Sequence, residues 1–280
     1  MKNPHSKVFL ITGVSSGLGR AFADAALAAG HVVVGTVRNA AAATEFEAGN
    51  PSRARSVVLD VTDFDDAAPA VEKIIRDVGP IDVLVNNAGY GHEGTLEESP
   101  LLEMQRQFDV NVFGAVAMIK AVLPGMRTQR SGHIINITSM AGLVAFPGIA
   151  YYASSKFALE GISEVLGEEV GHFGIKVTAF ELGSFRTDWA GRSMVRTGRS
   201  ITDYDRLFNP LRRARAAKSG KQIGDPAKAA QALLKIVETE HPPAHLVLGS
   251  DAITLVRQKI AGLSREIDQW EELSLSTDFS

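Results

Sequence analysis

Short runs of β-branched and other apolar residues alternate with longer amphipathic stretches along most of this chain. Because the runs are almost continuously apolar, they are typical of strands covered on both faces. The repeated alternation predicts a doubly wound α/β domain over residues 1–280, in which a seven-stranded parallel sheet is flanked by helices on both faces. The predicted strands are Val8–Thr12, Val32–Val37, Ser56–Asp60, Ile81–Val85, His133–Ile137, Ile175–Phe180 and His245–Leu248, and the helix-like stretches lie near 17–29, 64–78, 100–127, 152–172, 226–239 and 251–263.

One stretch, residues 185–221, departs from this pattern because it is strongly basic. It holds ten Lys and Arg against three Asp. Two interpretations stay open: a solvated, irregular insertion, or a mobile substrate lid that attracts an anionic ligand. An apolar side for such a lid would come from Phe185, Trp189, Tyr204, Leu207 and Phe208.

Composition restricts the classes of function. A net charge of -3 gives no reason to expect a nucleic acid or a membrane as partner. The chain has no cysteine, and its seven histidines show no paired ligand spacing, so we expect neither a disulfide nor a metal site. No apolar run approaches ~18 residues and no apolar signal region follows the N-terminus, so we expect a cytoplasmic protein without a transmembrane helix.

A glycine-rich loop directly follows the first predicted strand. It reads Thr12-Gly13-Val14-Ser15-Ser16-Gly17-Leu18-Gly19 and opens a helical stretch. Glycines at such a junction let the phosphates of a nucleotide approach backbone N–H groups at a helix N-terminus. The same residues fit the Gly-x-Ser-x-Gly elbow of serine hydrolases, with Ser15 as nucleophile. The hydrolase alternative is disfavoured, because an elbow on the first strand leaves no upstream loop to supply an oxyanion donor.

A tyrosine and a lysine lie four residues apart in a predicted helix. Tyr152 and Lys156 therefore share one helix face. A nearby ammonium favours the phenolate, so we expect the pKa of this phenol to fall below its usual ~10. Tyr151 is adjacent, but only Tyr152 has the lysine one turn away. Ser139 lies thirteen residues upstream at the end of a predicted strand.

Five motifs, in this order, resemble those of the short-chain dehydrogenase/reductase family. The resemblance runs from residue 7 to about residue 249. It implies a single Rossmann-type domain and an oxidoreductase that acts on a CH–OH group, transferring a hydride between a nicotinamide cofactor and a carbonyl or alcohol. The motifs are Thr12-Gly13-x-x-x-Gly17-x-Gly19, Asn86-Asn87-Ala88-Gly89, Asn111, Ser139 and Tyr152-x-x-x-Lys156.

The resemblance also implies catalytic roles. Tyr152 would act as general acid in carbonyl reduction and as general base in alcohol oxidation. Lys156 would lower the pKa of that phenol and hold the nicotinamide ribose. Ser139 would hydrogen-bond the substrate oxygen as charge develops there. Asn111 would support a water-linked proton path to Lys156.

The end of the second predicted strand indicates which nicotinamide cofactor is used. NAD-preferring proteins of this fold usually place a carboxylate there, whereas here Val37 stands in that position and Arg38 follows. A guanidinium can pair with a 2′-phosphate, so we expect NADP(H). By resemblance, the other cofactor-binding residues are Gly13, Ser15, Ser16, Gly17, Leu18, Gly19, Asp60, Val61, Asn87, Ala88, Gly89, Tyr152, Lys156, Gly183 and Thr187.

The substrate side is less well determined by the sequence. Leu182 stands where many relatives carry proline, and because proline stiffens a turn, we expect a looser loop over the nicotinamide. The candidate substrate contacts imply a moderately apolar carbonyl or alcohol. They are Ser139, Tyr152, Phe146, Phe185 and Trp189.

The family resemblance also bears on the oligomeric state and on an alternative function. The family commonly associates through helices corresponding to 100–127 and 152–172, so we expect a homodimer or homotetramer. A non-catalytic, NADP-sensing regulator on the same fold stays open as the alternative. Such a regulator would be expected to lack Tyr152, Lys156 or Ser139, and all three are present.

Overall fold

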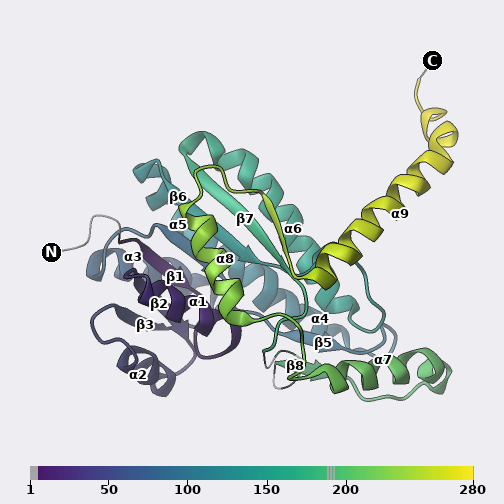
Figure 1. Ribbon diagram of the computed structural model, residues 1–280, viewed down its shortest axis with the longest axis horizontal. Coiled ribbons are helices and arrows are strands. Elements are labelled where there is room, and N and C mark those ends of the chain that lie inside the picture. The colour runs from purple at the N-terminus through teal and green to yellow at the C-terminus, as the bar shows by residue number, and fades with distance from the viewer. Residues whose placement is uncertain (1–5, 188, 190, 192, 280) are drawn as a thin grey trace.

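The computed structural model of the chain describes residues 6–187, 189, 191 and 193–279. Its main sheet has seven parallel strands in the order β3-β2-β1-β4-β6-β7-β9, which confirms the predicted fold class (Figure 1). The order reverses between β1 and β4, so the carboxyl ends of these strands open a crevice suited to ligands. The strands are β1 (Val8–Ile11), β2 (Val32–Val37), β3 (Ala54–Val58), β4 (Val83–Asn86), β6 (Gly132–Ile137), β7 (Ile175–Leu182) and β9 (His245–Leu248).

Helices cover both faces of the sheet. Side chains alternate along each strand, so Phe9 and Leu10 of β1 enter different cores. Phe9 packs in the core that includes Phe22 and Leu233, whereas Leu10 packs in the core that includes Met118. The first layer holds α1 (Gly17–Ala28), α2 (Ala40–Ala48) and α8 (Pro226–Glu238), and the second holds α3 (Ala67–Asp77), α5 (Gly114–Gln129) and α6 (Ala150–Val170).

A continuous helical stretch of 29 residues, Leu101–Gln129, has a mean hydropathy of 1.4 in its most apolar window. It comprises α4 (Leu101–Phe108), a π-helical turn (Asp109–Phe113) and α5. By length and composition this stretch could cross a membrane, whereas no such helix was expected from the sequence. A core helix meets the same criteria, and here α4 contacts α6 while α5 contacts α3.

Several elements were not predicted. The missed helix α2 begins after Asn39, whose Oδ1 accepts a hydrogen bond from Ala42 N at 2.9 Å. The basic segment is not irregular throughout, because it contains β8 (Met194–Arg196) and α7 (Asp205–Lys218). β8 pairs with β5 (Gly91–Glu93) in a separate two-stranded parallel sheet. The last helix, α9 (Ser250–Leu275), is longer than the 251–263 stretch expected.

Candidate active site

The loop between β1 and α1 packs closely against the loop after β4. Gly13 and Gly17 have φ values of +74° and +62°, which glycine adopts without strain. A Cβ on Gly19 would lie only 2.3 Å from both Asn87 Nδ2 and Gly13 O. At the start of α1 the Ser16 side chain makes no capping hydrogen bond. This backbone cradle fits a phosphate group, because the helix N-terminus is not capped by its own side chain.

Thr12 joins the two loops; the sequence placed it in the glycine motif but gave it no role of its own. Its Oγ1 accepts hydrogen bonds from the backbone N–H groups of Asn87 and Ala88, both at 2.9 Å. In return, Asn87 Nδ2 donates to Thr12 O at 2.9 Å and Gly13 O at 3.1 Å. Two predicted cofactor residues, Asn87 and Ala88, are thus held against the glycine loop.

The predicted adenosine-side residues follow the next two strands at the same edge of the sheet. Arg38 is exposed directly after β2. Asp60 follows β3, and its Oδ1 accepts hydrogen bonds from Thr62 N (3.0 Å) and Thr62 Oγ1 (2.8 Å). A Cβ on Gly114 would lie 2.8 Å from Val61 O, so this backbone lies tightly against the start of α5. Because parallel strands end at one edge, these residues and the glycine loop border one crevice.

Three of the four predicted catalytic side chains converge at the start of α6. Lys156 Nζ donates to Ile137 O at 2.7 Å and lies 5.9 Å from the centroid of the Tyr152 ring. The Ser139 side chain is hydrogen-bonded to the Tyr152 phenol. Ser139 Oγ also accepts a hydrogen bond from Ala141 N at 3.1 Å. All three side chains are buried, so any substrate that reaches them leaves bulk water.

Asn111 joins this cluster from the π-helical turn between α4 and α5. Its Oδ1 accepts from Tyr90 N at 3.1 Å, and its Nδ2 donates to Tyr90 O at 3.1 Å and Ser155 Oγ at 3.0 Å. A Cβ on Gly89 would lie 3.0 Å from Asn111 Oδ1 and 3.7 Å from Lys156 Nζ. Gly89 therefore lets the asparagine and the lysine approach one another, and π-helical turns often occur at functional sites.

The expected lowering of the phenol pKa is wrong for the protein by itself. Burial raises the pKa of Tyr152 to about 12, and the hydrogen bond from Ser139 opposes this rise only in part. Burial also lowers the pKa of Lys156 to about 8, although the charge of Glu160 opposes it. A site shielded from water disfavours the charged form of each group, the phenolate of Tyr152 and the ammonium of Lys156. Tyr152 consequently keeps its proton at neutral pH, as a general acid must.

A buried carboxyl cluster lies one helical turn beyond Lys156, and sequence reasoning missed it. His245 Nδ1 lies 2.6 Å from Glu181 Oε1 and 3.5 Å from Glu160 Oε2. Burial raises the pKa of Glu160 to about 7 and also raises the pKa of Glu181. Donor atoms of the three side chains lie within 4.8 Å of one another, a set that a divalent cation could use. The available signal was Glu160, four residues after Lys156 on the same helix face.

The predicted substrate contacts separate into two groups. The rings of Tyr152 and Trp189 have centroids 4.9 Å apart, and Phe146 packs in the same apolar cluster. Phe185 instead packs against the core between the sheet and helices α1 and α8. A Cβ on Gly224 would lie 2.8 Å from the Phe185 ring. The structure therefore brings Phe146 and Trp189, but not Phe185, to Tyr152.

The loop after β7 is tied down rather than loosened. Leu182 pairs in register with Leu248 of β9, which extends the strand. Gly183 N donates to Leu248 O at 2.8 Å, and Ser184 N donates to Asp251 Oδ2 at 3.0 Å. Thr187 approaches the glycine loop, since a Cβ on Gly17 would lie 3.9 Å from Thr187 Cβ. Strand pairing thus replaces the stiffness that the absent proline would provide.

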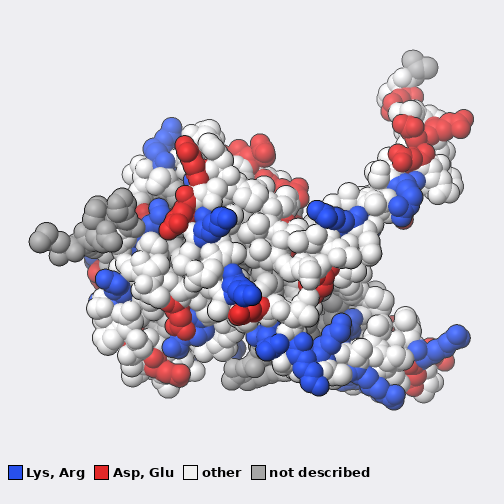
Figure 2. All heavy atoms as spheres, viewed as in Figure 1, with Lys and Arg blue, Asp and Glu red and all other residues white. Residues whose placement is uncertain are grey.

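Residues 185–221, which we call the cap segment, are anchored by acidic side chains from residues 91–98. Glu93 is 1% exposed, and its oxygens lie 3.0 Å from Arg196 Nε and 3.1 Å from Arg215 Nη1. Glu98 pairs with Arg199 and accepts a hydrogen bond from Ser200 N at 2.6 Å. Part of the basic charge is therefore neutralised by these two carboxylates. Figure 2 shows basic side chains gathered over α7.

Comparisons with known proteins agree with this geometry. A family model described as short chain dehydrogenase matches residues 7–196. Oxidoreductase BOA17 of Botryotinia fuckeliana is 37% identical over 273 residues, which is 97% of this chain and 99% of that protein. The 3-ketodihydrosphingosine reductase of Bacteroides thetaiotaomicron is 39% identical over 246 residues, covering 87% of this chain and 88% of that protein.

A solved structure extends the likeness to the whole chain. The crystal structure of a short-chain dehydrogenase from Streptomyces avermitilis has a TM-score of 0.92 and 39% identity. It covers 99% of this chain, and this chain covers all of it. ElxO with NADP bound is more distant, with a TM-score of 0.72 and 25% identity over 87% of this chain and 96% of that one. This chain belongs to the short-chain dehydrogenase family of oxidoreductases.

Proposed function

We propose that this protein interconverts a moderately apolar carbonyl compound and its alcohol with NADP(H) as cofactor. The observation that carries the proposal is the buried cluster of Ser139, Tyr152 and Lys156 beside the glycine cradle. These are a hydrogen-bond donor, a protonated phenol and a cation, placed at the carboxyl edge of a parallel sheet where ligands bind.

The residues present fit a dinucleotide. The cradle of Gly13, Gly17 and Gly19 would hold its phosphates, and exposed Arg38 would pair with a 2′-phosphate. When bound, the nicotinamide would supply the hydride. Support for NADP comes from ElxO with NADP bound, and from a gluconate 5-dehydrogenase in complex with NADP and tartrate. A relative 34% identical over 227 residues is named NADPH-dependent 3-dehydrocapnine reductase.

The chain's own groups would manage charge and protons at the substrate oxygen. Ser139 donates a hydrogen bond to that oxygen and stabilises charge as it develops. Tyr152 transfers its phenolic proton to the same oxygen in reduction and removes it in oxidation. As the phenolate forms, the Lys156 ammonium stabilises it, and this compensates for the burial that otherwise keeps the phenol protonated. Asn111 fixes the backbone at Tyr90 beside this lysine.

Apolar walls favour a substrate with a hydrophobic portion. Trp189 and Phe146 border the Tyr152 phenol and supply apolar contact area rather than charge. The name 3-ketodihydrosphingosine reductase, borne by a relative, makes a long-chain ketone a rational member of the first substrate panel.

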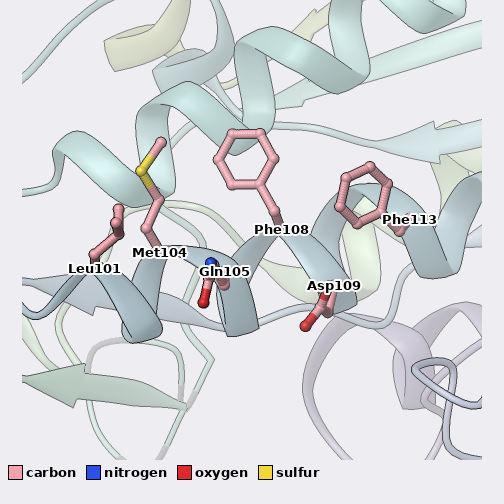
Figure 3. Close-up of a pocket in the computed structure, with 6 residues that line it drawn as sticks. All are labelled: Leu101, Met104, Gln105, Phe108, Asp109 and Phe113. Atoms are coloured by element: carbon pink, nitrogen blue, oxygen red, sulfur yellow. The ribbon is translucent and has the colours of Figure 1, made fainter.

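A homodimer or homotetramer in the cytoplasm completes the proposal. The outer face of α4 and the turn that follows it is apolar, with Leu101 66% exposed and Phe113 50% exposed. These residues line a shallow pocket together with Met104 and Phe108 (Figure 3). Large exposed apolar patches mark contact surfaces, and this face lies on the helices through which we expect the subunits to associate.

The test is NADPH oxidation with a carbonyl panel, comparing wild type with Tyr152→Phe. We expect the variant to lose ~10²–10⁴-fold in kcat/KM, because it cannot transfer the proton. Tyr151→Phe is the matched control: this phenol donates to Ser99 O at 2.7 Å, away from Lys156, and its loss should leave most of the turnover. Equal turnover by wild type and Tyr152→Phe would contradict the role of Tyr152.

The same panel separates the enzyme from its alternative. A non-catalytic NADP-sensing regulator would bind NADPH tightly and turn over none of the carbonyl compounds. A serine hydrolase would instead show acylation of Ser15 by a fluorophosphonate probe. Retained NADPH binding in Tyr152→Phe, with lost turnover, is the outcome that supports catalysis.

A further inference from the structure

The C-terminal helix α9 leaves the body of the protein and projects away from it (Figure 1). Its first turns are anchored, since Ala252 and Val256 are buried. From Arg257 to Phe279, every residue except the half-buried Gly262 is exposed. At 1.5 Å per residue, the helix from residue 257 to residue 275 extends about 28 Å. A solvated helix of this length gains little from packing on its own body, so its side-chain pattern has another cause.

Six apolar residues form one stripe along α9, from residue 253 to residue 270, with spacings that alternate between three and four. This is the 3.5-residue repeat of a coiled-coil seam, which two helices bury by packing against each other. Beyond the anchored turns, the seam residues Ile260, Leu263, Ile267 and Trp270 are between 47% and 63% exposed. The whole seam is Ile253, Val256, Ile260, Leu263, Ile267 and Trp270.

Charge is separated along the same helix. Figure 2 shows basic side chains near the body and acidic ones toward the far end. Two copies in antiparallel orientation would place each basic half beside an acidic half, whereas parallel copies would bring like charges together. The acidic far end also disfavours an anionic lipid surface as partner. The basic residues are Arg257, Lys259 and Arg265, and the acidic ones are Glu266, Asp268, Glu271, Glu272 and Asp278.

We propose that α9 is a self-association surface that pairs antiparallel with α9 of a second copy of this chain. Ile260 lies opposite Trp270 of the other copy, and Leu263 opposite Ile267, so that the exposed part of the seam is buried on both helices. In this register Arg257 meets Glu271 of the other copy. The surface is distinct from the α4 face in Figure 3, and the proposal does not depend on the proposed reaction.

The first test measures the mass of the full-length protein by light scattering across a concentration series. The double variant Ile267→Glu/Trp270→Glu buries four like charges in the paired seam, and we expect its mass to be half that of wild type. Gln258→Glu/Gln269→Glu adds the same charge outside the seam and should keep the wild-type mass. An unchanged mass in the seam variant, or an equal loss in the control, would overturn the proposal.

The second test establishes the orientation and does not rely on disrupting the helix. Because the chain has no cysteine, introduced thiols are the only ones present. Arg257→Cys and Glu271→Cys chains, carrying tags of different size, are co-expressed and mildly oxidised. We expect the mixed disulfide between the two variants to predominate. Disulfides mainly between two Arg257→Cys chains, or no cross-link, would overturn the antiparallel pairing.

Discussion

The nucleotide cradle and the cap segment border the same crevice but are held by different physical means. The cradle, residues 12–19 with Asn87 and Ala88, is held by backbone hydrogen bonds and by glycines with no room for a side chain. The cap segment is held by ion pairs that reach across more than 100 positions, such as Glu93 with Arg196 and Arg215. One side of this site is therefore fixed by close steric fit and the other by charge.

This contrast suits the two tasks of the site, which are to bind the cofactor and to bind the substrate. The cofactor is the same molecule in each cycle, so its binding site can be rigid. Substrates must enter and leave, and a segment held by ion pairs opens locally more easily than a buried sheet edge. Changes in the cradle should therefore affect cofactor binding, and changes in the cap anchors should affect substrate binding.

The largest effect should come from Gly19→Ala. The added methyl would lie 2.3 Å from both Asn87 Nδ2 and Gly13 O, so the cradle must open. Overpacking of this kind costs ~3 kcal/mol, which corresponds to a loss of ~100-fold or more in NADPH affinity, measured by fluorescence titration. Gly161→Ala on α6 is the matched control, since a Cβ there has nothing within 4 Å. Unchanged NADPH affinity in Gly19→Ala would contradict the claim that close steric fit in the cradle determines cofactor binding.

The cap side is tested by Glu93→Gln. The buried carboxylate is the shared partner of Arg196 and Arg215, and these charged hydrogen bonds weaken when the charge is removed. We expect the substrate KM to rise and the free energy of unfolding to fall by ~2 kcal/mol, with NADPH affinity preserved. Glu97→Gln serves as control, because Glu97 is exposed and its carboxylate accepts a hydrogen bond from Tyr204 OH at 2.6 Å, away from both arginines. A loss of NADPH affinity with unchanged KM would contradict the comparison.

Arg38→Ala tests the adenosine side of the cofactor site separately from the glycine cradle. The guanidinium is exposed, so its pairing with a 2′-phosphate is worth ~1.4 kcal/mol, a tenfold change in affinity. NADPH affinity should fall about tenfold while NADH affinity stays constant, as measured by titration with both nucleotides. An equal loss for both would show that Arg38 acts on the fold rather than on the phosphate.

The smallest effect is the acid sensitivity of the cap segment. A backbone hydrogen bond from Ser200 and a side-chain hydrogen bond from Thr95 lower the pKa of Glu98 to about 2. Because the folded-state pKa is depressed, this stabilisation is present above the unfolded value of 4.5 and is lost as pH falls from there toward 2. In a Trp270→Phe background, Trp189 fluorescence should report cap release over that range. If Glu98→Gln leaves the transition unchanged, Glu98 is not its cause.

The sequence predicted most reliably the strands of the main sheet and the motifs at their carboxyl ends. The seven strands were each predicted to within a few residues, because runs buried on both faces carry little ambiguity. The glycine loop and the Tyr152–Lys156 pair were found from local spacing, and Ser139 from the family resemblance. The structure brings all three together at one sheet edge.

The features that could not be predicted depend on residues that are far apart in the sequence and close in the fold. The partners of Glu93 lie more than 100 positions away, so the anchoring of the basic segment was not visible. The pKa of Tyr152 was predicted in the wrong direction, because spacing reveals a nearby lysine but not the burial that dominates the shift. Phe185 was assigned to the substrate from its position in the loop, whereas its ring packs into the core.

The central claim is that the crevice between the cradle and the cap carries out hydride transfer with Tyr152 as proton donor. The most direct measurement uses NADPH labelled with deuterium at the transferable position, with the best carbonyl substrate, and analyses the product by mass spectrometry. We predict an alcohol with one deuterium on the former carbonyl carbon from wild type, and at least ~100-fold less of it from Tyr152→Phe. An unlabelled product, or equal labelled product from both proteins, would contradict the account.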